Sequence, residues 1–192
     1  PPVFASQIIQ QEQFSGKLFE IMNNNDKKLS PLALNILNLL PTLESQNSLL
    51  RNFNANDPQL WAKFLTYKSK YLLLYRLNMI GSIVQLGASD WIDFFYKTGG
   101  LKVLLGMVIF VIRKNFSNED DLILFILRVS TLFVQQKHWN TYKKDIIESF
   151  DSNALKTLVQ FAIDYIDNKE ILGCLISITS AFTIDAMKNA DN

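Results

Sequence analysis

Apolar side chains recur along this chain at the spacing of an α-helix, in segments that begin after capping residues and stop at glycine or proline. Few stretches show the alternation of polar and apolar residues that is typical of half-buried strands. With only 7 Gly and 5 Pro among 192 residues, long regular elements are expected. The sequence therefore predicts an all-α fold.

Start and stop signals place about nine or ten helices along the chain. Serine, aspartate or asparagine precedes most of the apolar runs, and such residues cap helix N-termini. The expected caps are Ser30-Pro31, Asp57-Pro58, Ser69, Ser89, Ser117, Asp151-Ser152 and Asn168. The expected helices cover residues 3–10, 14–22, 32–40, 57–66, 69–86, 89–98, 100–114, 122–136, 154–166 and 170–188. Short links between helices make successive helices antiparallel neighbours.

Short and long helices alternate loosely, in pairs that recur every ~30 to 45 residues, a pattern typical of α-solenoids. Sequence identity between the pairs is too faint to define a strict repeat. The central long helices are apolar around most of their circumference, so they must be covered on several sides. We expect one armadillo/HEAT-like α-solenoid domain over residues 1–192, with a compact helical bundle as the alternative.

The first residues, Pro1-Pro2-Val3-Phe4, lack an initiator methionine, which indicates a fragment of a larger protein. The longest unbroken apolar run, Val103–Ile112, has ten residues, whereas a bilayer span needs about 20. We therefore expect no membrane span. The single cysteine, Cys174, excludes an internal disulfide and suits a reducing compartment. The expected location is the cytoplasm, with the nucleus left open.

Charge gives no sign of a nucleic-acid partner. The net charge is +1, from 19 Lys and Arg against 18 Asp and Glu. The densest basic spots are the pairs Lys27-Lys28, Arg113-Lys114 and Lys143-Lys144. Because phosphate backbones need a basic stripe, we expect no nucleic-acid binding. The expected partner is a protein.

The sequence offers little for catalysis. His138 and Cys174 are the only residues of their kinds, they are 36 residues apart, and no zinc-ligand spacing exists. Cys174 lies in an apolar run and is expected to be a buried, inert thiol, while His138 is expected to pack or cap beside Trp139. Gly99-Gly100 has no preceding strand, so it is expected to be a tight turn between helices. No catalytic residue, metal or cofactor is expected.

Narrow polar stripes along the apolar helices fit binding better than catalysis. In a stack of helices such stripes would line a concave groove and hydrogen-bond the backbone of an extended partner. Alternatively, each stripe is only the solvated face of its helix. The candidate binding residues are Asn35, Asn38, Asn78, Ser82, Gln85, Arg128, Thr131 and Gln135. Ser177 and Ser180, three residues apart near the C-terminus, form a further stripe of the same kind.

Four motifs occur in order between residues 37 and 105. The chain has a helix ending in Leu39-Leu40-Pro41-Thr42, then Trp61, then an L-L-Y-x-L helix, and then a W-x-x-x-F-x-x-x-G-G-L-x-x-L-L run from Trp91 to Leu105. This order resembles the long helical region ahead of the catalytic domain in the very large ubiquitin-specific proteases. Armadillo units in general also favour a glycine turn followed by L-x-x-L-L.

The resemblance implies a parent protein that is a cysteine-type deubiquitinase, with this segment as a non-catalytic scaffold that binds substrates or adaptors. The catalytic Cys and His boxes of that family are absent from this sequence, so the resemblance assigns no catalytic residue. The last motif also resembles the armadillo-like regulatory domain of formins, which binds a Rho-type GTPase. That domain is the alternative identity.

Overall fold

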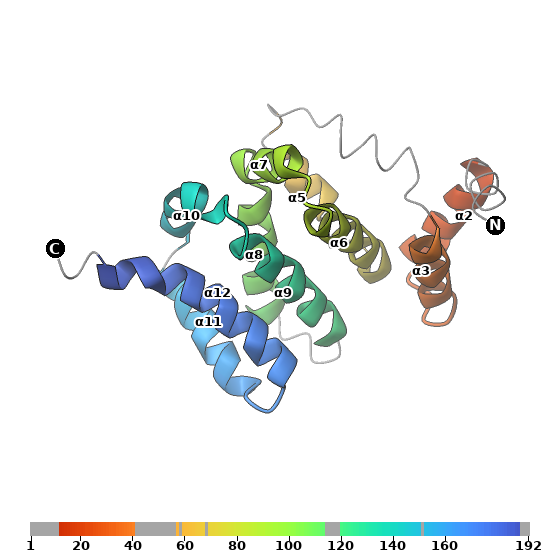
Figure 1. Cartoon of the computed structure of the whole chain (residues 1–192). Coiled ribbons are helices and arrows are strands. Elements are labelled where there is room, and N and C mark those ends of the chain that lie inside the picture. Colours follow the sequence, from red (N-terminus) through yellow and green to blue (C-terminus); the bar gives the residue numbers. More distant parts are fainter. Residues whose placement is uncertain are drawn as a thin grey trace. The chain divides into compact units, whose positions relative to one another are not determined.

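The computed structural model describes residues 12–40, 57, 59–67, 69–113, 120–150 and 152–188. Every regular element in these ranges is an α-helix, which confirms the all-α prediction. The ten helices are α2 (Glu12–Asn23), α3 (Leu29–Leu39), α5 (Leu60–Phe64), α6 (Lys70–Gln85), α7 (Ser89–Lys97), α8 (Gly100–Arg113), α9 (Asp120–Val134), α10 (Trp139–Glu148), α11 (Ser152–Asp164) and α12 (Lys169–Lys188). Figure 1 shows their order along the chain. The expected helix over residues 3–10 lies outside the described residues.

Several of the expected caps are confirmed. The Oδ1 atom of Asp57 accepts a hydrogen bond from the backbone N–H of Gln59 at 2.9 Å. The Oδ1 atom of Asn168 accepts one from the N–H of Ile171 at 3.2 Å. Gly87 ends α6 with a φ of 71°, a conformation that glycine adopts without steric cost. The expected caps Ser117 and Asp151 lie outside the described residues.

Ser30 and Ser89 do not act as the expected caps. The carboxylate of Asp26 caps α3 instead, by accepting hydrogen bonds from the N–H groups of Lys28 and Leu29, both at 2.8 Å. Those two backbone donors lower the pKa of the Asp26 carboxyl. The hydroxyl of Ser30 donates to the carbonyl oxygen of Ile21 at 2.8 Å, which ties the first turn of α3 to the end of α2.

Helix α10 was not expected from the sequence. Its residues, WNTYKKDIIE, include few apolar side chains and follow no strong capping residue. The helix nevertheless buries Trp139 and Ile146, so two well-placed apolar side chains anchor it to the rest of the structure.

The chain divides into two compact units, Pro1–Met79 and Ile80–Asn192, and the boundary falls inside α6. In the first unit α2 packs against α3, and the ring of Phe19 meets that of Tyr75 edge-on at 5.5 Å. The guanidinium of Arg76 lies 4.9 Å from the centroid of the Phe64 ring and donates from Nη1 to the Phe64 carbonyl oxygen at 2.6 Å. That one side chain therefore fixes α6 to α5. The prediction of a single domain stays a prediction.

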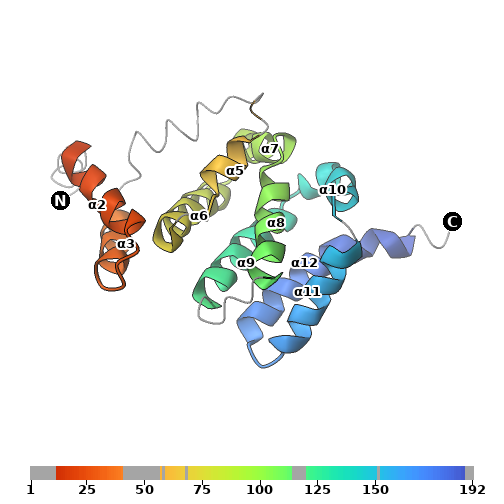
Figure 2. The same cartoon turned by 180° about the vertical axis from the view of Figure 1, so that it is seen from behind.

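The second unit has two layers of long helices. Helix α9 packs against both α8 and α12, and α11 packs against both α8 and α12. Figures 1 and 2 show α9 and α12 side by side on one face of this unit, with α8 and α11 on the opposite face. Helices α7 and α10 are the short helices that precede each long pair.

A repeat of 49 residues runs through the buried positions of three helices. Four positions spaced i, i+4, i+7 and i+11 on α6 recur on α9 and again on α12, each time 49 residues later. They are Leu73, Leu77, Ile80 and Val84, then Leu122, Ile126, Val129 and Phe133, then Ile171, Leu175, Ile178 and Phe182. All twelve side chains are buried. The repeating element in the second unit is therefore a short helix followed by two long ones, rather than the expected pair.

Two glycines shape the turn between α7 and α8. Gly99 has a φ of 80°, in the left-handed region, so the expected tight turn is present there. Gly100 is buried, and its Cα faces the ring of Phe95. That ring is fully buried and stacks on Phe133 with centroids 4.4 Å apart.

Within the described residues no single helix is long and apolar enough to cross a membrane. Helices α7 and α8 would meet that requirement only together, and they are bent by 66° at the break between them.

Candidate functional site

A hollow of about 320 Å³ lies between the end of α9, the start of α10 and the middle of α12, all within the second unit. Its lining combines amide, hydroxyl and ammonium groups with a few apolar side chains. The lining residues are Val134, Gln135, Trp139, Asn140, Lys143, Ser177, Ser180 and Ala181. The structure thus brings the predicted Gln135 together with the Ser177 and Ser180 stripe.

Arg128 and Thr131, on the same helix as Gln135, already have partners within the chain. The Nη2 atom of Arg128 donates to Oε2 of Glu170 on α12 at 3.0 Å, and both side chains are exposed. The hydroxyl of Thr131 donates to the carbonyl oxygen of Leu127 at 2.9 Å. A surface ion pair of this kind contributes about 0 to 1 kcal/mol, so a ligand can displace it at little cost.

The remaining predicted residues do not line this hollow. In the first unit, the Nδ2 atom of Asn78 donates to Oδ1 of Asn38 at 2.9 Å, so these two candidates bind each other. Asn35 is exposed on α3. Ser82 and Gln85 are exposed on the last turns of α6.

Three of the small polar residues occupy equivalent positions of the repeat. Ser82, Thr131 and Ser180 are successive members of one series with a spacing of 49 residues. The hydroxyls of Thr131 and Ser180 donate to the carbonyl four residues earlier in their own helices, at 2.9 and 2.6 Å. Each hydroxyl oxygen keeps an acceptor lone pair for a ligand, while the donors must come from other side chains. Gln135, Asn140 and Lys143 supply such donors at the hollow.

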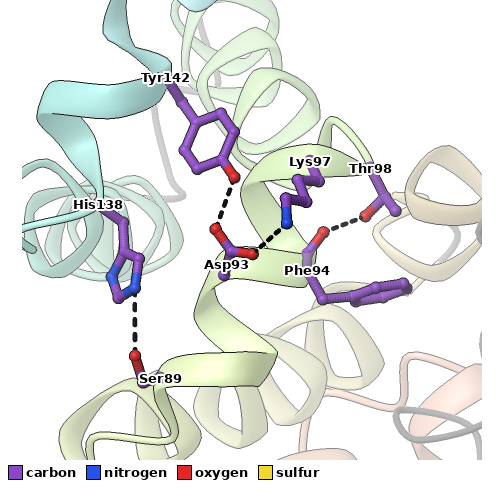
Figure 3. Close-up of polar contacts among 7 residues, drawn as sticks. All are labelled: Ser89, Asp93, Phe94, Lys97, Thr98, His138 and Tyr142. Atoms are coloured by element: carbon purple, nitrogen blue, oxygen red, sulfur yellow. Dashed lines mark hydrogen bonds and ion pairs between the residues drawn. The ribbon is translucent and has the colours of Figure 1, made fainter.

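Helices α7 and α10 are joined by hydrogen bonds between residues that are themselves 49 positions apart (Figure 3). The hydroxyl of Tyr142 donates to Oδ1 of Asp93 at 2.6 Å, and Ser89 Oγ lies 3.2 Å from Nε2 of His138. Lys97 forms an ion pair with Oδ2 of the same Asp93 at 2.7 Å. Equivalent positions of neighbouring repeats therefore meet directly.

Lys97 and Tyr142 lower the pKa of the Asp93 carboxyl, with Lys97 contributing most. Because this pKa is lowered in the folded protein, the stabilisation from the ionised carboxylate is complete at neutral pH. It is lost only as the pH falls through the folded-state pKa.

The Ser89–His138 contact does not have the geometry of a catalytic pair. A nucleophilic serine needs a histidine whose second ring nitrogen is held by an acceptor. The Nδ1 atom of His138 is buried and has no hydrogen-bond partner among the described residues, while Asp93 is bound by Lys97 and Tyr142. The contact joins two helices and leaves the imidazole unoriented for proton transfer.

Cys174 lies in different surroundings from His138. Its thiol lies beside Thr131 and near Arg128, whereas the ring of His138 lies 6.3 Å from that of Tyr96. Burial raises the pKa of the Cys174 thiol, so the reactive thiolate is disfavoured. The side chain is half-buried, which is less than the sequence led us to expect.

Trp139, Asn140 and Lys143 belong to the hollow and were missed as site residues. All three lie on α10, the helix that sequence patterning did not detect. The 49-residue repeat is the signal that locates this helix, because it places α10 as far after α7 as α12 lies after α9.

Comparisons with protein-family models, with curated proteins and with solved structures gave no match to this chain.

Proposed function

We propose that this chain is a non-catalytic protein-interaction scaffold with an armadillo/HEAT-like solenoid arrangement in its second unit. The observation that carries the proposal is the 49-residue repeat. It recurs in buried positions, and it also recurs in hydrogen bonds between equivalent residues of α7 and α10. Stacked repeats of this kind present long surfaces for binding rather than an enclosed reaction centre.

The hollow between α9, α10 and α12 is the proposed binding site. Its amides donate and accept hydrogen bonds, its serine oxygens accept them, and Lys143 carries a positive charge. These groups suit the alternating donors and acceptors of an extended polypeptide, with an acidic side chain or a terminal carboxylate at Lys143.

The order of motifs over residues 37–105 suggests the identity of the scaffold. We propose that it is the helical region of a large ubiquitin-specific protease and that its partners are substrates or adaptors of that cytoplasmic enzyme. The formin-like regulatory domain stays the alternative. A titration with Rho-type GTPases loaded with a non-hydrolysable GTP analogue separates the two identities, because saturable binding is expected only for the formin-like domain.

The double variant Arg128→Ala with Gln135→Ala tests the hollow. Capture of partners from cell extract on the immobilised chain is expected to fall at least fivefold, as quantified by mass spectrometry. Both residues are exposed, so the fold is expected to be unchanged. A matched control, Lys102→Ala with Gln160→Ala, removes one cation and one amide from the opposite layer and should leave capture unchanged. Equal capture by the wild type and both double variants would refute the proposed site.

A further inference from the structure

Helices α11 and α12 carry large apolar side chains that are exposed on the last repeat of the described chain. On α11 they are Val159, Ile163 and Ile166, spaced i, i+4 and i+7 along one stripe. On α12 the exposed apolar residue is Ile176, and Leu172, one turn earlier, is half-buried. Because α11 packs against α12, these side chains belong to one end of the second unit.

The repeat shows what covers this kind of surface. Ile176 is equivalent to Leu127 of α9, and Leu172 is equivalent to Ile123, each 49 residues earlier. Leu127 is 0% exposed and Ile123 is 4% exposed, whereas Ile176 is 54% exposed. The helix packed against α9 on the C-terminal side of the repeat is α12. Among the described residues, α12 packs against only α9 and α11, so no further helix covers Ile176.

The internal template also defines the chemistry of the missing helix. Toward the rest of the unit α12 presents Ile171, Leu175, Ile178 and Phe182, at the spacing i, i+4, i+7 and i+11. Its rims toward α9 carry an ion pair from Glu170 and a half-buried thiol, so the contact is mostly apolar. A helix that covers Ile176 in the same way must offer an apolar stripe of that spacing.

We propose that the end face formed by Leu172 and Ile176 of α12 with Val159, Ile163 and Ile166 of α11 binds an amphipathic helix of a partner protein. The partner helix carries aliphatic or aromatic residues at i, i+4, i+7 and i+11 and lies along α12 as α12 lies along α9. This inference rests on the proposed scaffold function and gives it a second contact surface, separate from the polar hollow, with a defined class of partner.

The probe is a labelled peptide with the sequence of residues 169–188, because α12 is the helix that covers the equivalent face of α9. Gly173→Ala and Cys174→Ser in the peptide favour the helix and prevent disulfide formation. Fluorescence anisotropy with the whole chain is expected to show saturable binding. A second peptide with Leu175→Asp and Ile178→Asp, which break the apolar stripe, is expected to bind at least tenfold more weakly.

Two variants of the chain locate the peptide. Ile176→Asp and Ile163→Asp each place a charge on the end face and are expected to weaken peptide binding at least tenfold. Both positions are more than half exposed, so circular dichroism should show an unchanged fold. Leu86→Asp, at an 84% exposed leucine elsewhere, is the matched control and should bind like the wild type.

Absence of peptide binding, or equal binding by wild type and Ile176→Asp, would overturn the end-face proposal. So would a chain that dimerises in sedimentation equilibrium and becomes monomeric with Ile176→Asp, because the occupant would then be a second copy. Failure of the scaffold function itself is read separately, from the Arg128→Ala and Gln135→Ala variant, which should bind the peptide normally.

Discussion

Replacing Gly100 with alanine is expected to destabilise the protein by about 2 kcal/mol, the scale of overpacking a tight core site. A Cβ atom on Gly100 would lie 2.5 Å from both Cδ2 and Cε2 of Phe95 and 2.8 Å from its Cγ. The ring cannot move away easily, because it is fully buried between Trp91, at 5.3 Å, and Phe133, at 4.4 Å. Urea unfolding followed by circular dichroism measures the loss.

The same substitution at Gly106 of the same helix is the matched control. A Cβ atom there meets nothing within 4 Å, and the residue is exposed. Alanine is therefore expected to stabilise the protein by about 0.5 to 1 kcal/mol through its higher helix propensity. The two substitutions should differ in sign. Equal stability of Gly100→Ala and Gly106→Ala would show that α7 and α8 do not meet at the Phe95 ring.

Phe133→Ala is expected to cost about 3 to 5 kcal/mol, as deletion of a buried phenylalanine does in other cores. Phe133 is fully buried, stacks on Phe95 and meets Tyr96 edge-on at 5.8 Å. The Tyr96 hydroxyl also donates to the Phe133 carbonyl oxygen at 2.6 Å, and burial raises the pKa of that hydroxyl. A chain of this size should lose about 10 °C in thermal midpoint, since each 1 kcal/mol lowers it by roughly 2 to 4 °C.

Phe110→Ala removes the same side chain from a 47% exposed position on α8. Its expected cost is about 1 kcal/mol, because only part of the ring's burial is lost. Similar losses for the two variants, in unfolding monitored by near-ultraviolet circular dichroism, would rule out Phe133 as a centre of the core.

The fold class and most helix ends could be predicted from the sequence because they depend on local chemistry. Asp57, Asn168 and Gly87 act where they were expected, through short-range hydrogen bonds or a positive φ. Ser30 was wrongly assigned as a cap because a serine before a proline looks like one locally. Its hydroxyl is instead used in a contact with Ile21, nine residues away, which no local rule contains.

The repeat itself was beyond patterning, since it joins chemically similar rather than identical residues. Leu122 corresponds to Ile171 and Val129 to Ile178, and only their shared burial reveals the series. For the same reason the site was predicted in part. Gln135 was identified, whereas Asn140 and Lys143 depend on how α10 packs against its neighbours.

The motif from Trp91 to Leu105, on which the family resemblance partly rests, has a packing role in this structure. Phe95, Gly100, Leu101, Leu104 and Leu105 are all buried, and Gly99 makes the turn. Such residues specify how two helices meet. The identity of the partner must therefore be decided by binding experiments on the exposed surfaces.

Deletion of residues 89–137, which is one repeat of 49 residues, tests most directly whether the three helices are equivalent. In the shortened chain α10 follows α6, and α12 takes the place of α9 against it. There Ile178 and Ala181 replace Val129 and Leu132, the two side chains closest to Gly81. We expect a soluble chain with proportionally less helix that still unfolds cooperatively in urea. A shortened chain that lacks a near-ultraviolet signal and unfolds without cooperativity would contradict the repeat.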